Sequence, residues 1–68
     1  MTNTSLLLHY IEESGLKKGY IAKQLGINRY SLAKKIKNEN EFLGSEMQKL
    51  GELLNLDCRE RDRIFFAR

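Results

Sequence analysis

The sequence contains no proline, no tryptophan and a single cysteine, Cys58. Proline interrupts helices, whereas the abundant Leu, Lys, Glu and Ala favour them, so an all-helical fold is predicted. One cysteine cannot form a disulfide within the chain, and we therefore expect a cytosolic protein. Because His9 is also the only histidine, a zinc site is excluded and no cofactor is expected.

Long apolar runs and catalytic motifs are lacking as well. No stretch approaches the roughly 20 apolar residues that span a bilayer. The N-terminus lacks the basic start and apolar stretch of a secretory signal, so no membrane partner is expected. The five glycines match neither a P-loop nor a dinucleotide-binding fingerprint, and nothing orders a catalytic triad. We therefore expect neither an enzyme nor a small-molecule substrate.

Acidic residues are missing from one segment of the chain, between positions 17 and 37. Its basic residues are Lys17, Lys18, Lys23, Arg29, Lys34, Lys35 and Lys37. The rest of the chain carries five basic and nine acidic side chains, so the net charge of +3 conceals a polarised molecule. An ordinary solvated surface explains Lys23, Lys35 or Lys37 equally well when each is taken singly. The whole set, without one acid, is better explained by a negatively charged partner.

A chain of 68 residues is expected to form one domain, 1–68, which buries about 60% of the surface of the extended chain. The predicted fold class is all-α, a single compact domain of about five short helices. Their predicted positions are 5–14, 18–25, 29–37, a fourth helix from Ser45 and a short fifth helix opened by Asp57. A loop at 38–44 is expected to be tied to the core by Phe42 and Leu43.

Short-range signals mark the ends of these helices. Thr4 or Ser5 is predicted to cap the first helix, and Gly15 to end it. Two capping boxes are predicted, one from Ser45 with Gln48 and one from Asp57 with Glu60.

Only three residues, "GIN", separate the second and third predicted helices. Gly26 can end the second helix in the left-handed conformation, and Asn28 can cap the third. Ala22 is small enough for two helices to cross closely, and Leu32 would hold the third helix to the core. A tight corner of this kind predicts a helix-turn-helix at about 18–37.

The segment "GLKKGYIAKQLGINRYSLAKKIKNE" resembles the helix-turn-helix of phage Cro and repressor proteins. Phe42, the "SEMQKLGELLNL" helix and the closing "RIFFAR" are similar to short Cro-like proteins of phages and prophages of Gram-positive bacteria. The resemblance covers Leu16 to Phe66. It implies a lambda repressor-like fold and a transcriptional regulator that binds double-stranded operator DNA, in the cytoplasm and nucleoid of a host bacterium.

One position departs from that family pattern. Members usually carry an aliphatic residue three positions after Leu32, where this chain has Lys35; the aliphatic residue comes one later, at Ile36. At about 100° per residue, Leu32 and Ile36 form an apolar arc that borders Arg29. The roll of this helix relative to DNA is left open by the sequence.

A helix in the major groove presents its N-terminal residues to the base edges. Arg29 and Lys34 are therefore candidates for base contacts. Tyr30 is a third, which could instead contact a phosphate or pack on the preceding helix. The residues expected to bind phosphates are Lys18, Asn28, Ser31, Lys35 and Lys37.

The apolar cluster Ile64, Phe65 and Phe66 has two interpretations. It could cover the core, or it could form an exposed patch that pairs subunits. We expect a mixture, with one phenylalanine in the core and the other nearer a dimer seam. A homodimer, at least on DNA, is the expected assembly, since a lone domain of this size would bind weakly.

A second hypothesis keeps the fold but changes the partner. In it the chain is a modulator that docks on another phage repressor through "RDRIFFAR", and the basic helix matters less.

Overall fold

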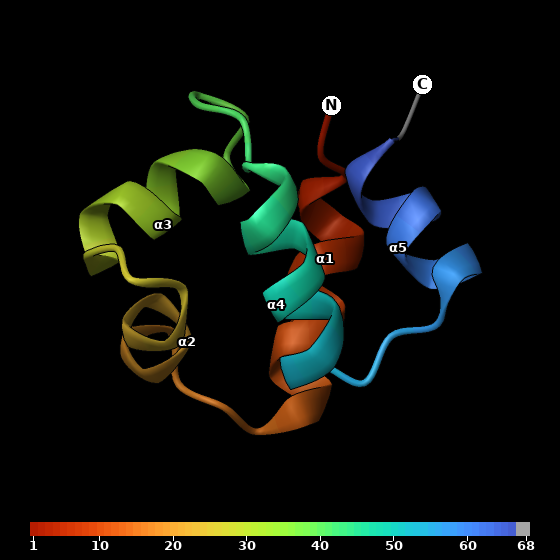
Figure 1. Cartoon of the computed structure of the whole chain (residues 1–68), viewed down its shortest axis with the longest axis horizontal. Helices are drawn as coiled ribbons and strands as arrows, with labels where there is room; N and C mark the ends of the chain where they lie inside the picture. Colours follow the sequence, from red (N-terminus) through yellow and green to blue (C-terminus); the bar gives the residue numbers. More distant parts are fainter. Residues whose placement is uncertain (67–68) are drawn as a thin grey trace.

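The computed structural model describes residues 1–66, which form five α-helices and no strand (Figure 1). The helices are α1 (Thr4–Ser14), α2 (Lys18–Leu25), α3 (Arg29–Ile36), α4 (Gly44–Leu53) and α5 (Cys58–Phe65). The prediction of a small all-α fold of five short helices is confirmed. Within the described residues, no helix is long and apolar enough to cross a bilayer.

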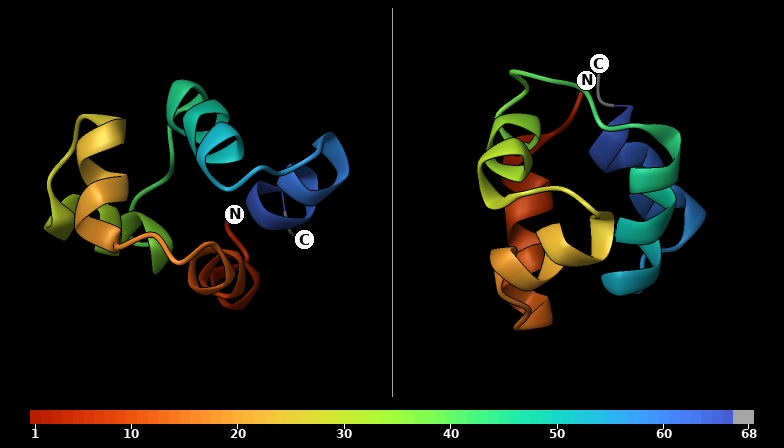
Figure 2. Two further views of the ribbon diagram at one scale, coloured as in Figure 1. Left: turned by 90° about the horizontal axis from the view of Figure 1, so that it is seen from below. Right: turned by 60° about the vertical axis from the view of Figure 1, so that its left-hand side comes forward.

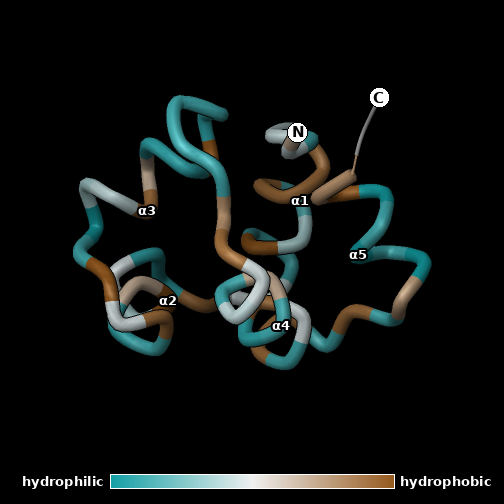
Figure 3. The backbone as a smooth tube through the Cα atoms, turned by 45° about the horizontal axis from the view of Figure 1, so that its top comes forward, coloured by the Kyte–Doolittle hydropathy of each residue, from teal (hydrophilic) through white to brown (hydrophobic). Residues whose placement is uncertain are grey.

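All five helices pack around one hydrophobic core. Helix α2 contacts α3 and α4, α1 contacts α3 and α5, and α4 contacts α5. Figure 2 shows that α2 and α3 lie on one side of the molecule and α5 on the other. Hydrophobic positions alternate with hydrophilic ones along the helices, as expected when each helix buries one face (Figure 3). The buried core residues are Leu7, Ile11, Ile21, Ala22, Leu32, Ile36, Phe42, Leu50, Leu54, Ile64 and Phe65. Phe42 ties its loop to the core as predicted, but Leu43 is exposed, so the prediction for Leu43 is wrong.

The predicted caps are partly correct. Asp57 and Glu60 form the expected capping box, with backbone-to-carboxylate distances of 2.7 and 2.9 Å. Gly15 ends α1 with φ of 73°. The predicted Ser45–Gln48 box is wrong, because α4 already begins at Gly44, one residue after its N-cap Leu43.

The cap predicted for α1 is also wrong. Asn3, and not Thr4 or Ser5, occupies the N-cap, and its side chain accepts a hydrogen bond from Leu6 N–H at 3.1 Å. The Thr4 hydroxyl instead donates to the backbone carbonyl of Ile36, at the end of α3. A contact so distant in sequence could not be read from the residues around the helix start.

The N-terminal segment lies between the ends of α3 and α5. Thr2 is buried, and Asn3 N–H donates to Ile64 C=O at 2.6 Å. Asn38, just after α3, contacts Thr2 through its side chain. These contacts close the core at the end where the chain begins.

Candidate nucleic-acid interface

The turn between α2 and α3 is fixed by backbone hydrogen bonds. Gly26 has φ of 75°, the left-handed conformation that glycine adopts without steric cost. Gly26 N–H donates to Lys23 C=O at 3.1 Å and Ile27 N–H to Ala22 C=O at 3.0 Å, which makes a Schellman motif. Asn28 then caps α3 by accepting from Ser31 N–H at 2.7 Å. The predicted helix end and cap are both confirmed, and they place α3 directly after a three-residue turn.

The acid-free segment forms α2, α3 and the turn between them. We refer to the exposed side of these two helices as the basic surface. Its exposed basic residues are Lys17, Lys18, Lys23, Arg29 and Lys37. Lys17 is the N-cap of α2 but makes no side-chain capping bond, so the first N–H groups of α2 are not covered by it. The positive end of the α2 dipole therefore adds to the side-chain charge there.

Arg29 lies against α2. A Cβ built on Gly19 would stand 3.4 Å from Arg29 Cδ and 3.7 Å from Nε, so the missing side chain at Gly19 leaves room for the arginine. A shallow groove is lined by Gly19, Arg29 and their neighbours Lys17, Lys18 and Tyr20. The fold thus gathers three cationic side chains from two helices around one groove.

Tyr30 and Lys34 form a pair on the outer side of α3. Tyr30 is 71% exposed, and Lys34 Nζ lies 5.2 Å from the centre of its ring. This separation is within the range of a cation–π interaction. Tyr30 therefore does not pack away on α2, and its ring orients the lysine one turn further along the helix.

Asn28 and Ser31 are already engaged with each other at the start of α3. The Asn28 Oδ1 atom takes the Ser31 N–H, so that N–H is not free for a phosphate. Ser31 is half-buried and Asn28 exposed. What these residues can still offer a phosphate is the Asn28 amide nitrogen and the Ser31 hydroxyl.

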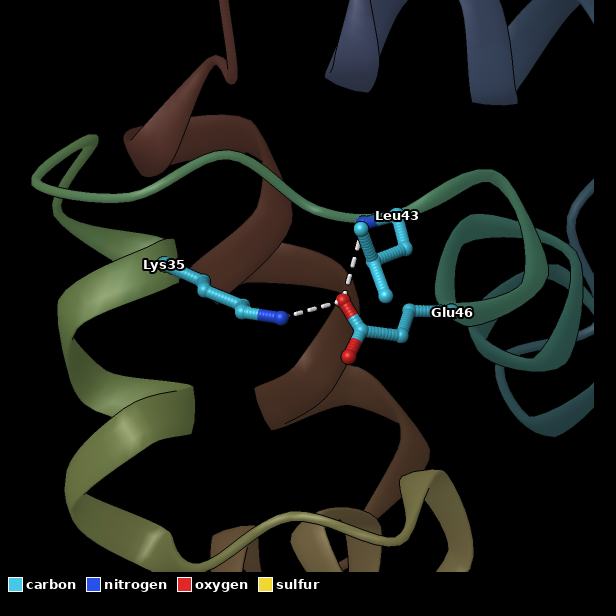
Figure 4. A network of polar contacts seen from close by, with 3 residues as sticks. All are labelled: Lys35, Leu43 and Glu46. Carbon is cyan, nitrogen blue, oxygen red and sulfur yellow. Dashed lines mark hydrogen bonds and ion pairs between the residues drawn. The ribbon is translucent and has the colours of Figure 1, made fainter.

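Lys35 does not belong to the basic surface, and its prediction as a phosphate-binding residue is corrected. Its side chain is only 13% exposed and points between α3 and α4, where Nζ lies 2.5 Å from Glu46 Oε1 (Figure 4). The Glu46 side chain is 6% exposed, and the same Oε1 accepts the Leu43 N–H at 2.8 Å. An ammonium held by a buried carboxylate has its charge balanced inside the protein.

Glu46 is the polar residue that the sequence prediction missed. A lysine at an expected aliphatic position was the available signal, because a cation placed there needs a buried anion as partner. The sequence did not indicate which of the nine acidic residues would provide it. Glu46 does so because it stands in the first turn of α4, beside α3.

Of the three residues of the C-terminal apolar cluster, two are buried and one is exposed. Ile64 and Phe65 are 0% and 2% exposed, and the Phe65 ring packs edge-to-face on Phe42 with centroids 5.4 Å apart. These two residues belong to the core, so the interpretation of the cluster as an exposed dimer or partner surface is wrong for Ile64 and Phe65. Phe66 is 60% exposed and borders a groove that Met1 and Met47 also line.

Comparisons of the chain with models of protein families, with curated protein sequences and with solved structures find no match. The likeness to Cro-type proteins therefore rests on the motif residues alone.

Proposed function

We propose that the chain is a sequence-specific regulator that binds double-stranded DNA, a Cro-type repressor of a phage or prophage acting in the cytoplasm of its bacterial host. The observation that carries the proposal is the basic surface: basic side chains of two helices joined by a three-residue turn, in a segment, 17–37, that contains no acidic residue. Phosphates, spaced along both strands of a duplex, are the partner that such a surface attracts and that an acid would repel.

The dimensions of α3 suit the major groove. Eight residues make a helix about 12 Å long, and the groove is about 12 Å wide. Arg29 stands in the first turn, where a guanidinium can pair with guanine O6 and N7. Lys34 and Tyr30 follow on the outer side of the helix. These three residues are the proposed base contacts.

Phosphate binding would come from residues around that helix. Lys18 opens α2, Lys37 follows α3, and Asn28 with Ser31 stands at the start of α3. The two lysines act through charge, so binding should weaken with salt at a log–log slope of about −0.9 per neutralised phosphate. Lys35 is left out of this set because Glu46 already balances it.

A two-fold dimer on DNA is part of the proposal. Two copies would place two α3 helices about 34 Å apart, one turn of duplex, and would bind a roughly palindromic site. Phe66 is the residue proposed for the seam, since it is the exposed member of the C-terminal cluster and lies beside Met1 at an apolar groove.

The test is a gel shift with Arg29→Ala and Lys34→Ala against duplexes selected by the unchanged chain. Each variant should lose about 5- to 150-fold in preference for the selected duplex, which corresponds to the roughly 1–3 kcal/mol of one good base contact. Arg59→Ala is the control, because Arg59 is an exposed arginine on α5, away from α3. Unchanged affinity and preference in both test variants would remove the base-contact assignment.

The second hypothesis, docking on another repressor, loses support from the burial of Ile64 and Phe65. Those residues would have supplied most of the apolar surface of "RDRIFFAR". The same gel shift separates the two functions: failure of the unchanged chain to shift any duplex at low salt would favour the docking function.

A further inference from the structure

The Lys35–Glu46 pair is the one salt bridge within residues 1–66, and it is almost entirely inside the protein. It joins the last turn of α3 to the first turn of α4 across 11 positions of sequence. Glu46 is fixed from its own side as well, because its Oε1 also accepts the Leu43 N–H that precedes α4. Lys35 is therefore held by an anchored carboxylate (Figure 4).

Such a pair is a poor source of stability. Burying two charges costs about as much as their attraction returns, and apolar residues of similar volume are often equally stable or better. An aliphatic residue at position 35 would have been the simpler way to fill the space between the helices. What an ion pair adds over an aliphatic contact is geometry, because a hydrogen bond fixes distance and direction where apolar packing tolerates small rotations.

That geometry bears on the residues that face outward from α3. Lys35 directly follows Lys34, so a fixed inward direction at position 35 fixes the outward direction of Lys34 about 100° away. Side chains of a helix reach a radius of about 5–6 Å, and a roll of about 20° would move them by about 2 Å. A shift of that size breaks a hydrogen bond to a base edge.

We propose that Lys35 and Glu46 are positioning residues that set the roll of α3 over the DNA bases and thereby sharpen sequence discrimination. The inference rests on the proposed function, since discrimination has meaning only if α3 meets bases. It assigns the pair no contact with DNA. Its effect is on which duplex is preferred and not on how strongly any duplex is attracted.

The test variant is Lys35→Met with Glu46→Gln. The double substitution removes one positive and one negative charge, so the net charge of +3 is unchanged and long-range attraction to phosphates is preserved. Methionine fills the volume of the lysine stem, and the glutamine amide oxygen can still accept the Leu43 N–H. Circular dichroism and a urea melt confirm folding before any binding is measured.

Both proteins are used to select from a pool of duplexes with about 20 randomised base pairs, which spans two half-sites about 10 base pairs apart. Affinities are then measured for the enriched duplex and for a scrambled one. We expect the ratio of the two affinities to fall about tenfold in the double variant, equal to about 1.4 kcal/mol. Affinity for the scrambled duplex and its salt slope should not change.

Glu46→Asp is the second variant, and it decides the matter if the double variant does not fold. It keeps both charges but withdraws the carboxylate from Lys35 by one methylene, so it too should lower the ratio. Lys37→Met is the matched control, since it removes an exposed lysine two residues further along; it should lower affinity for both duplexes alike and reduce the salt slope by about 0.9.

Two results would overturn the inference in distinguishable ways. A folded variant whose affinity ratio stays within about twofold of the unchanged chain shows that the pair only holds the fold together. If the unchanged chain binds no duplex at low salt, the proposed function fails, and the positioning role fails with it.

Discussion

The side chain of Asn38 bonds both backbone groups of Thr2. Its Oδ1 accepts from Thr2 N–H and its Nδ2 donates to Thr2 C=O, each at 2.7 Å. Asn38 adopts φ of 66°, and that left-handed conformation, which asparagine tolerates better than most residues, directly follows the end of α3. One side chain thus ties the N-terminal segment to the end of the helix proposed to enter DNA.

Asn38→Gly tests this connection without changing the backbone conformation, because glycine accepts positive φ. Loss of two partly buried hydrogen bonds should lower the free energy of unfolding by about 1–3 kcal/mol, measured by urea denaturation. Asn55→Gly is the matched control. Asn55 also has positive φ, 56°, but makes no side-chain hydrogen bond within the described residues, so its replacement should change stability by less than about 0.5 kcal/mol. Equal effects of the two substitutions would contradict the role given to the Asn38 side chain.

Lys35→Met by itself should be far more damaging than the double substitution with Glu46→Gln. The single change leaves the Glu46 carboxylate buried without its cation, which costs about 3–5 kcal/mol in comparable cases. The double variant leaves no buried charge. Its free energy of unfolding should therefore lie within about 1 kcal/mol of that of the unchanged chain, or above it. Urea melts of the two variants side by side make the comparison. Similar midpoints for both would show that Glu46 finds another partner or moves to solvent.

The hydrogen bond made by the Tyr10 hydroxyl should make the stability of the fold depend on pH in the alkaline range. Its hydroxyl donates to Glu60 Oε2 at 2.7 Å, which ties α1 to α5. That hydrogen bond, followed by burial and by the negative charge of Glu60, raises the pKa of Tyr10 above its usual 10.0. As pH rises, the unfolded chain therefore loses this proton before the folded one does. The stabilisation is complete below the usual pKa and is lost as pH rises through the pKa of the folded state.

The Tyr10→Phe variant lacks this titration. Its melting temperature should be below that of the unchanged chain at neutral pH, and the difference should shrink over the alkaline range above the usual tyrosine pKa of 10.0. Thermal melts followed by circular dichroism across that range measure it. A constant difference at all pH values would mean that the hydroxyl does not titrate with unfolding.

Two substitutions of Tyr30 test whether its ring orients the Lys34 side chain for DNA binding. Tyr30→Phe keeps the ring beneath Lys34 Nζ, whereas Tyr30→Leu removes it. If the ring orients the lysine, the leucine variant should bind the selected duplex about two- to fivefold more weakly, as expected from a cation–π interaction of about 0.5–1 kcal/mol, and the phenylalanine variant should bind normally. Fluorescence anisotropy with labelled duplex gives both affinities. Equal losses in the two variants would instead point to the phenolic hydroxyl as a phosphate contact.

Phe66 should matter for association and not for folding. Because it is 60% exposed, Phe66→Ser should change the free energy of unfolding by less than about 0.5 kcal/mol. If two copies meet there, the variant should lose cooperativity on a two-half-site duplex and remain monomeric at concentrations where the unchanged chain pairs. Sedimentation velocity and DNA titration report the two effects. Unaltered association would place the seam elsewhere.

Short-range patterns in the sequence were enough for most of the helices. Five helices, the left-handed ends at Gly15 and Gly26, the Asn28 cap and the Asp57–Glu60 box were all predicted correctly. Each depends on hydrogen bonds or periodicity within a few residues, so the information lies in neighbouring letters. The concentration of positive charge in one segment is likewise a property of the sequence itself.

The tertiary structure decided the contacts between distant segments. Lys35 pairs with Glu46 and does not join the basic surface. Ile64 and Phe65 lie in the core. Asn38 bonds Thr2, which is 36 positions away in the sequence. A lysine at an aliphatic position, or an apolar cluster near the end of a chain, has the same local pattern whether it is buried or exposed. Its environment is set by which helices pack against it, and that depends on the free energy of the whole core. The sequence by itself therefore determined the helices and the sign of the surface, while only the packed structure decided which charges were left to form it.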